Sequence, residues 1–232
     1  MVSRRTFLVL GGSALLTPGI SLCAEVPALL DHIVLGCNDL NRGITFVEGY
    51  TGVRPAFGGV HPGGGTQNAL LSLGERRYLE ILAPDPTQPD ANSPPFLKRL
   101  SQPRLVRWAV HPGDLAALAK KLREADIAFE GPTLGSRKRP DGLVLQWQAL
   151  RLKDTASEML PFFIEWSADS IHPSADSPKG CSLLRFEAST PDPETLRKQA
   201  ALLHLDLGIV KGDRPQLHAA IAGPRGQLTI TS

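Results

Sequence analysis

Four side chains that can bind or move charge stand in the middle of predicted strands. Side chains alternate between the two faces of a strand, so an interior residue is directed to one defined side of its sheet. An imidazole and carboxylates can transfer protons or bind a cation, whereas a guanidinium binds anions. If the sheet curls into a cup, we expect all four to converge. They are His32, Glu80, Arg107 and Glu165.

These residues belong to a repeat within the chain. Residues 32–40 and 107–115 can be laid over each other, and each stretch reaches an aspartate seven residues after its first residue. Asp39 and Asp114 are typical helix caps, and leucines follow both at helical spacing. A repeat of strand, capped helix and strands predicts two copies of one unit that bury their apolar faces against each other.

The remaining segments set the expected domain organisation. A proline-rich stretch, 84–95, is incompatible with a central strand and connects the two units, and 167–180 forms a second linker. The C-terminal part shows a further strand, a helix over 193–205 and two short strands, and we expect it to pack on the paired units or on a second subunit, which leaves a homodimer open. The predicted boundaries are a domain over 25–170 with modules 29–83 and 104–166, and a partial third module over 180–232.

The order and spacing of these motifs resemble the vicinal oxygen chelate superfamily, and within it the glyoxalase-like branch. The resemblance covers roughly residues 29 to 232. It implies an α+β fold in which paired βαβββ modules form a half-open barrel around a divalent metal, with a partial third βαββ module at the C-terminus. The stretches that carry it are 30–35, 61–68, 78–82 and 161–166.

The resemblance also implies metal ligands on the first and last strand of each module. By position, Arg107 fills one of these four slots, and arginine has no lone pair to offer a metal. One histidine and two carboxylates suit Zn²⁺, Mn²⁺, Fe²⁺ or Ni²⁺, with open positions for water or substrate. The alternative is a site without metal, in which Arg107 pairs permanently with Glu165. The predicted ligands are His32, Glu80 and Glu165.

The function that follows is a metal-dependent lyase or isomerase acting on a small oxygenated, anionic compound. Glu165 is the expected general base, and Arg107 is expected to anchor substrate charge. The alternative from another class is a metal-free protein that binds or sequesters a small molecule, and a scaffold role comes third. The residues expected to contact the ligand are Arg107, Gln67, Asn68, Tyr78 and Phe163.

Composition is that of an ordinary globular protein. The 232 residues are 42% hydrophobic and 21% charged, with a net charge of +2. The short basic run 137–139 is interpreted as a solvated loop, and without a broader basic face a nucleic-acid partner is not expected. The isolated histidines are interpreted as surface or structural residues. They are His111, His172, His204 and His218.

The N-terminus is typical of an export signal. Arg4 and Arg5 precede a short apolar run over 9–16, which resembles a twin-arginine signal peptide ending near residue 24. A membrane span needs about 20 apolar residues, so no stable span is expected after signal removal. The predicted location is the periplasm, where Cys37 and Cys181 would be permitted to form a disulfide.

Overall fold

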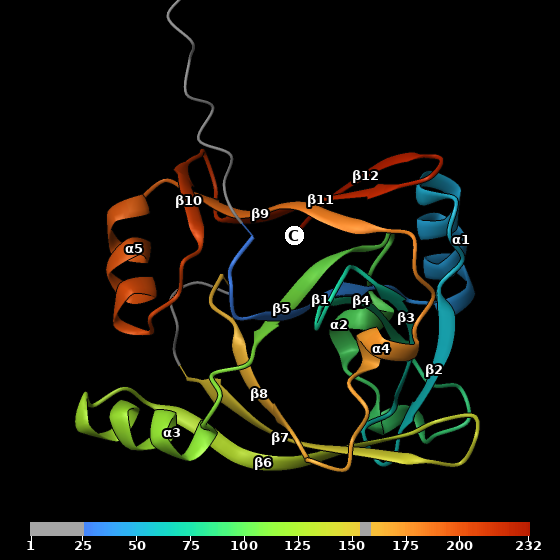
Figure 1. Cartoon of the computed structure of the whole chain (residues 1–232), viewed down its shortest axis with the longest axis horizontal. Coiled ribbons are helices and arrows are strands. Elements are labelled where there is room, and N and C mark those ends of the chain that lie inside the picture. Colours follow the sequence, from blue (N-terminus) through green and yellow to red (C-terminus); the bar gives the residue numbers. More distant parts are fainter. Residues whose placement is uncertain (1–25, 154–158) are drawn as a thin grey trace, which may run out of the picture.

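Eight strands close into a barrel in this computed structural model, which describes residues 26–153 and 159–232 (Figure 1). The predicted signal peptide over 1–24 lies outside the described residues. Around the barrel the strands follow the order β1-β4-β3-β2-β6-β7-β8-β5. Their bounds are β1 Leu30–Gly36, β2 Ala56–His61, β3 Thr66–Ser72, β4 Tyr78–Pro84, β5 Arg104–Val110, β6 Phe129–Lys138, β7 Val144–Leu152 and β8 Phe162–Trp166.

The barrel consists of two modules with the same strand pairing. In the first, β1 is followed by helix α1 (Leu40–Thr51) and runs parallel to β4; in the second, β5 is followed by α3 (Leu115–Glu124) and runs parallel to β8. The modules join through the antiparallel pairs β1–β5 and β2–β6. The predicted pair of βαβββ modules is therefore confirmed, and the barrel they form is closed.

The helix starts follow from the aspartates that the repeat singled out. Asp39 accepts a hydrogen bond from the Arg42 N–H at 2.8 Å, and Asp114 accepts one from the Ala117 N–H at 2.8 Å. Each carboxylate satisfies a backbone donor that the first helical turn leaves unpaired. Gly52 then ends α1 in the left-handed region, with φ at 79°.

The two linkers hold only short helices. The connection between the modules contains the 3₁₀ helix η1 (Asp90–Asn92) and α2 (Pro95–Lys98), and the segment after β8 contains α4 (Pro173–Asp176). Proline stands at the first position of both α2 and α4, where its missing N–H costs no hydrogen bond.

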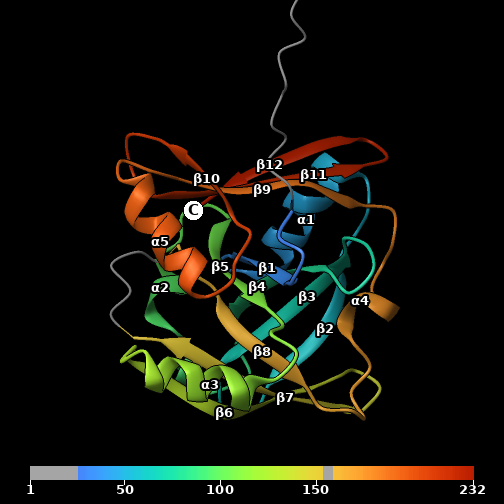
Figure 2. The ribbon, with the colours of Figure 1, turned by 60° about the vertical axis from the view of Figure 1, so that its left-hand side comes forward.

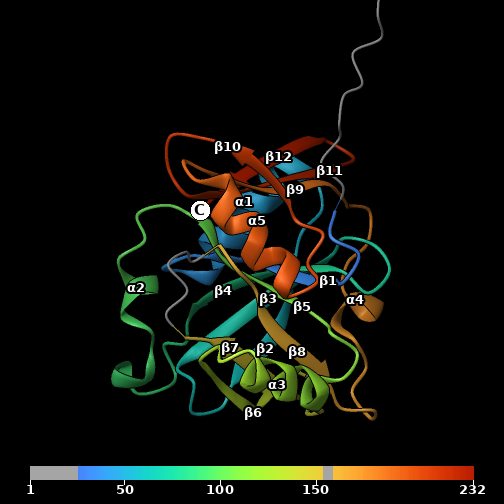
Figure 3. The same ribbon diagram turned by 90° about the vertical axis from the view of Figure 1, so that its left-hand side faces the viewer.

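A second sheet lies across one side of the barrel, with α1 between them (Figures 2 and 3). Its strand order is β10-β9-β11-β12. In each barrel module the first strand runs parallel to the last strand, whereas here β9 runs parallel to β10. The short strand β10 was not expected from the sequence. Trp108 of β5 packs on Phe186 of β9 with ring centroids 5.0 Å apart, which joins the two sheets in one core. The elements are β9 Ser182–Thr190, α5 Pro193–Leu202, β10 Gly208–Lys211, β11 Gln216–Gly223 and β12 Gly226–Thr231.

Two sequence expectations concern the compartment. Cys37 and Cys181 are both buried and both free thiols in the structure. Among residues 26–153 and 159–232, no helix has the length and apolar character needed to cross a membrane.

Candidate functional site

The barrel encloses a cavity of about 610 Å³ to which both modules contribute. Module one supplies most of the groups that can exchange protons, and module two supplies arginines and large aromatic rings. The principal lining residues are His32, His61, Asn68, Tyr78 and Glu80 from module one, and Arg107, Arg137, Trp147, Arg151, Phe162 and Trp166 from module two.

His32 is held in one orientation by a buried carboxylate. Its Nδ1 lies 2.7 Å from Asp31 Oδ1, and its ring stacks on Tyr78 with centroids 4.5 Å apart. Since a carboxylate accepts, Nδ1 carries the proton, and in the neutral ring the Nε2 lone pair is free. Nε2 lies 3.8 Å from Glu80 Oε2. The imidazole therefore presents a basic nitrogen to the Glu80 side of the cavity.

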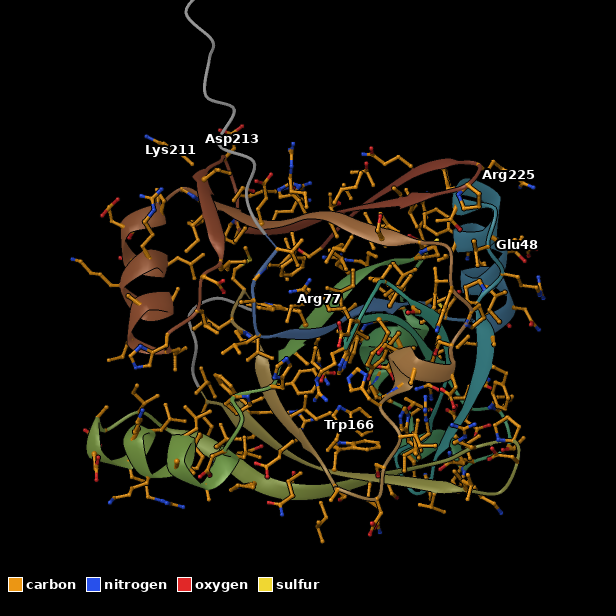
Figure 4. The ribbon with its side chains drawn as sticks, viewed as in Figure 1. Glu48, Arg77, Trp166, Lys211, Asp213 and Arg225 are labelled. Carbon is orange, nitrogen blue, oxygen red and sulfur yellow. The ribbon has the colours of Figure 1, made fainter. Side chains whose placement is uncertain are left out.

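The second oxygen of Asp31 binds two further donors. His172 Nε2 lies 3.1 Å and Trp166 Nε1 3.2 Å from Oδ2. The Ser174 N–H donates to His172 Nδ1, which leaves the proton of the neutral ring on Nε2, directed at Asp31. Figure 4 labels Trp166, which extends from the end of β8 toward the barrel interior.

Asp31 is a stable anion in this setting. Burial alone raises the pKa of its carboxyl group, but the hydrogen bonds from His172 and His32 outweigh that effect and hold the pKa well below its usual value of 3.8. Its carboxylate therefore stays available to accept the hydrogen bond from His32 Nδ1, as in other Asp–His pairs.

A chain of hydrogen bonds runs along the cavity wall from one module to the other. Arg137 Nη1 donates to Asn68 Oδ1 at 3.3 Å, and Asn68 Nδ2 donates to Glu80 Oε1 at 2.7 Å. Gly58 leaves room for this chain, because a Cβ there would lie 2.5 Å from Asn68 Oδ1 and 2.7 Å from Arg137 Nη1. These two hydrogen bonds hold the Glu80 carboxylate and the Arg137 guanidinium in fixed positions.

Arg137 is a buried cation that makes no direct ion pair with any residue the structure describes. It is only 3% exposed, and within the described residues its Nε has no hydrogen-bond partner and its guanidinium forms no ion pair. Burial lowers the pKa of Arg137, but an arginine side chain stays protonated in proteins. An unpaired buried charge is costly, so this position favours an anionic ligand.

A second imidazole lies on the opposite side of Glu80. His61 Nε2 is 3.8 Å from Glu80 Oε1, and Nδ1 is 2.8 Å from Thr66 Oγ1. Burial lowers the pKa of His61, and the charge of Glu80 offsets only part of that shift. His61 is therefore neutral at pH 7 and adds a second uncharged nitrogen beside the carboxylate.

The structure places most of the predicted module-one residues at the cavity. His32, Tyr78 and Glu80 share the inner face of β1 and β4, as alternation predicts, and Asn68 and Arg107 also line the cavity. Gln67 does not, because it lies on the other face of β3 and donates to the Pro84 carbonyl at 3.0 Å.

The side chains of β8 were predicted to lie on the wrong face of the sheet. Ala109 pairs with Phe162, which puts Phe162 on the same inner side as Arg107. Glu165 and Phe163 consequently point outward. Glu165 Oε2 accepts a hydrogen bond from the Leu115 N–H at 2.7 Å, at the start of α3, while Phe163 is buried in the apolar core. Glu165 thus neither reaches His32 nor pairs with Arg107.

The residues present do not fit the implied metal site. In module one Val34 pairs with Glu80, and in module two the equivalent pair is Ala109 with Phe162. The four slots therefore hold His32 and Glu80 but Arg107 and Phe162, and the last two cannot ligate a metal. The described part of the chain contains no group of three or more His, Cys, Asp or Glu side chains placed to hold an ion.

Several site residues were not found from the sequence, among them Arg137, Asp31, His61 and His172. Arg137 belongs to the run interpreted as a solvated loop, but Arg137 and Lys138 lie at the end of β6, and alternation would have separated the two side chains. Asp31 directly precedes His32, a signal that a carboxylate was available to the ring. His61 and His172 come from a glycine-rich loop region and a linker, and nothing in their spacing shows what they contact.

Comparison with known proteins identifies relatives of the fold. A family model described as a glyoxalase-like domain matches residues 30–203, in agreement with the vicinal oxygen chelate resemblance. The crystal structure of a hypothetical protein from Staphylococcus aureus is similar with a TM-score of 0.61 and 18% identity, covering 87% of this chain and 84% of that one. Methylmalonyl-CoA epimerase from Mycobacterium tuberculosis gives a TM-score of 0.42 and 21% identity, covering 60% and 87%. A search of curated protein sequences found no significant match.

Proposed function

Because this chain belongs to the glyoxalase-like domain family, we propose that it is an enzyme that moves a proton on a small anionic, oxygenated compound held inside the barrel. One observation carries the proposal: the unpaired, buried Arg137 is joined through Asn68 to Glu80, which lies beside His32. An anion-binding group and two proton acceptors thus share one enclosed space.

The reaction follows from the positions of these groups. A substrate carboxylate or carbonyl oxygen binds Arg137, which brings the adjacent C–H bond to His32 and Glu80. His32 Nε2 takes the proton, and the electron pair of the C–H bond moves into the carbonyl to give an enolate. The guanidinium of Arg137 stabilises the charge on the enolate oxygen. Return of the proton to another carbon or face completes an isomerisation, and loss of a neighbouring group completes an elimination.

Asp31 supports this step without touching the substrate. Its carboxylate keeps the Nδ1 proton in place and stabilises the imidazolium that forms on His32. His172 and Trp166 fix the carboxylate in turn. We assign them a positioning role.

No step of this mechanism passes through a metal, since module two offers Arg107 and Phe162 at the ligand positions. We expect turnover to survive dialysis against a chelator. If dialysis abolished turnover and one added divalent ion restored it, His32 and Glu80 would bind a metal together with ligands other than those predicted.

A second candidate is a binding protein that sequesters an anionic aromatic compound. The tilted pair Trp147 and Trp166, with ring centroids 5.2 Å apart, favours it because the two rings form an aromatic wall facing the arginines. Binding alone needs neither His32 nor Glu80.

Isotope exchange separates the two candidates. Carbon acids of several classes, namely 2-oxo acids, 2-hydroxy acids and malonate, would be incubated with the protein in D₂O and followed by proton NMR. The enzyme hypothesis predicts exchange with at least one class, lost in His32→Gln and retained in the matched control Glu165→Gln. Tight binding without exchange in any class would favour sequestration.

Export is part of the same proposal. It rests on Arg4 and Arg5 ahead of the apolar run 9–16. Cell fractionation of the full chain is expected to place the protein in the periplasm, and a double Arg4→Lys, Arg5→Lys variant is expected to stay in the cytoplasm. Equal distribution of the two proteins would contradict export by this route.

A further inference from the structure

A second pocket, of about 690 Å³, opens next to the barrel cavity. We call it the outer pocket. Its walls come from β5, from residues 159–162 before and at the start of β8, and from Pro215 and Ser232 of the C-terminal unit. Four residues line both spaces, so the two are neighbours with a common boundary. The shared residues are Phe96, Arg107, Arg151 and Phe162.

Three guanidinium groups line the outer pocket, those of Arg104, Arg107 and Arg151. None of the three forms an ion pair with a residue in 26–153 or 159–232. Glu130, an acidic residue near Arg151, instead pairs with Lys153 at 3.2 Å. The pocket therefore concentrates positive charge, and although the terminal residue Ser232 also lines it, no carboxylate of the described residues forms an ion pair with these arginines.

Aromatic rings hold two of these arginines at the boundary. The Arg107 guanidinium lies over the Phe96 ring and the Arg151 guanidinium over the Phe162 ring, each 5.4 Å from the ring centroid. Such stacking orients a guanidinium and leaves its N–H edge free for an anion. Burial and the charge of Arg107 both lower the pKa of Arg151, as expected where two cations face each other.

From this arrangement we infer that the ligand has two parts, with its reacting end at Arg137 in the barrel and a phosphoryl group, mono- or diphosphate, in the outer pocket. Three guanidinium groups match the charge and the several oxygens of a phosphate better than those of a single carboxylate. The inference rests on the proposed function for the inner end only. Arg107 and Arg151, at the boundary, would contact the ligand where it passes between the two spaces.

Calorimetry with two probes tests the inference on the full mature chain. Inorganic diphosphate is the probe for the outer pocket, and malonate is the probe for the barrel. In Arg104→Gln, at a residue that lines the outer pocket but not the barrel cavity, we expect the diphosphate affinity to fall about tenfold or more, with malonate affinity unchanged. The matched control is Arg197→Gln on α5, where the side chain pairs with Glu194 on the surface.

The outcomes separate this inference from the proposed function. Absence of diphosphate binding, equal binding by Arg104→Gln, or loss of diphosphate binding in Arg137→Gln would each overturn the outer pocket. Mutual exclusion of diphosphate and malonate would do the same, because the two parts must bind together. Failure of every carbon acid to exchange in D₂O would overturn the proposed reaction while leaving diphosphate binding in place.

Discussion

The two modules have the same topology but contribute different chemistry to one cavity. Module one presents His32, His61 and Glu80, which can accept protons, while module two presents arginines and aromatic rings. At equivalent positions of the repeat, Arg107 stands for His32 and Phe162 for Glu80. A duplicated scaffold that could surround a metal with symmetrical ligands has instead one half suited to proton transfer and one half suited to holding an anion.

This division predicts that substitutions in module one lower the rate and substitutions in module two lower the affinity. If the modules shared both tasks, a substitution in either module would change the rate and the affinity together.

The largest effect is expected in module one, for Asp31→Asn. An asparagine can donate to Nδ1, which would move the His32 proton to Nε2 and remove the base from the cavity. Turnover should fall by about 10²- to 10⁴-fold with little change in KM, as steady-state kinetics with an exchanging carbon acid would show. Thermal unfolding of the same variant controls for misfolding. An unchanged kcat would mean that His32 is not the base.

The second-largest effect is expected in module two, for Arg137→Gln. Losing a charge-assisted hydrogen bond should weaken malonate binding by about 10- to 100-fold. Arg107→Gln is the matched comparison, because Arg107 lies at the exposed boundary and should matter less for so short a ligand. Calorimetry measures both. Equal losses in the two variants would remove the distinction between the deep and the outer arginine.

A smaller effect concerns the pH dependence of stability. The pKa of His61 in the folded protein lies below its usual value of 6.5, so below that pH the unfolded chain takes up a proton that the native state does not. The free energy of unfolding should fall as pH drops under 6.5, by at most about 1.4 kcal/mol per pH unit for this group. Urea titrations of wild type and His61→Asn should differ by this slope. Parallel pH profiles would show that His61 is not held neutral.

The smallest effect is expected for Glu165→Ala, outside the cavity. Its carboxylate caps the Leu115 N–H at the start of α3, and losing such a contact costs about 1 kcal/mol of stability. Denaturant unfolding should show this loss while isotope exchange continues at the wild-type rate. A drop in exchange would return Glu165 to the catalytic role that the sequence suggested.

Much of the fold could be predicted because alternation and capping are local. The aspartate caps, the proline-rich connection and the inner faces of β1, β4 and β5 follow from residues close in sequence. The inner face of β8 does not, since it depends on the register against β5, and moving that register by one residue exchanges the faces.

The remaining site contacts are long-range and leave no periodic pattern. Asp31 meets His172 and Trp166, which lie 141 and 135 residues further along the chain, and Arg137 meets Asn68 across 69 residues. Only the closed barrel brings such positions together. Sequence spacing therefore identified His32 and Glu80 but not the groups that orient them or balance their charge.

The two strand pairs that join the modules differ in length. β1 and β5 pair along most of their length, whereas β2 and β6 share a single register pair, Val60 with Lys138, next to Gly59. The hypothesis that follows is that β2 and β6 separate when ligand enters or leaves, because they share so few hydrogen bonds. Amide hydrogen exchange would then be faster at Val60 than at Ile33, and slower exchange at Val60 would argue that the wall stays shut there.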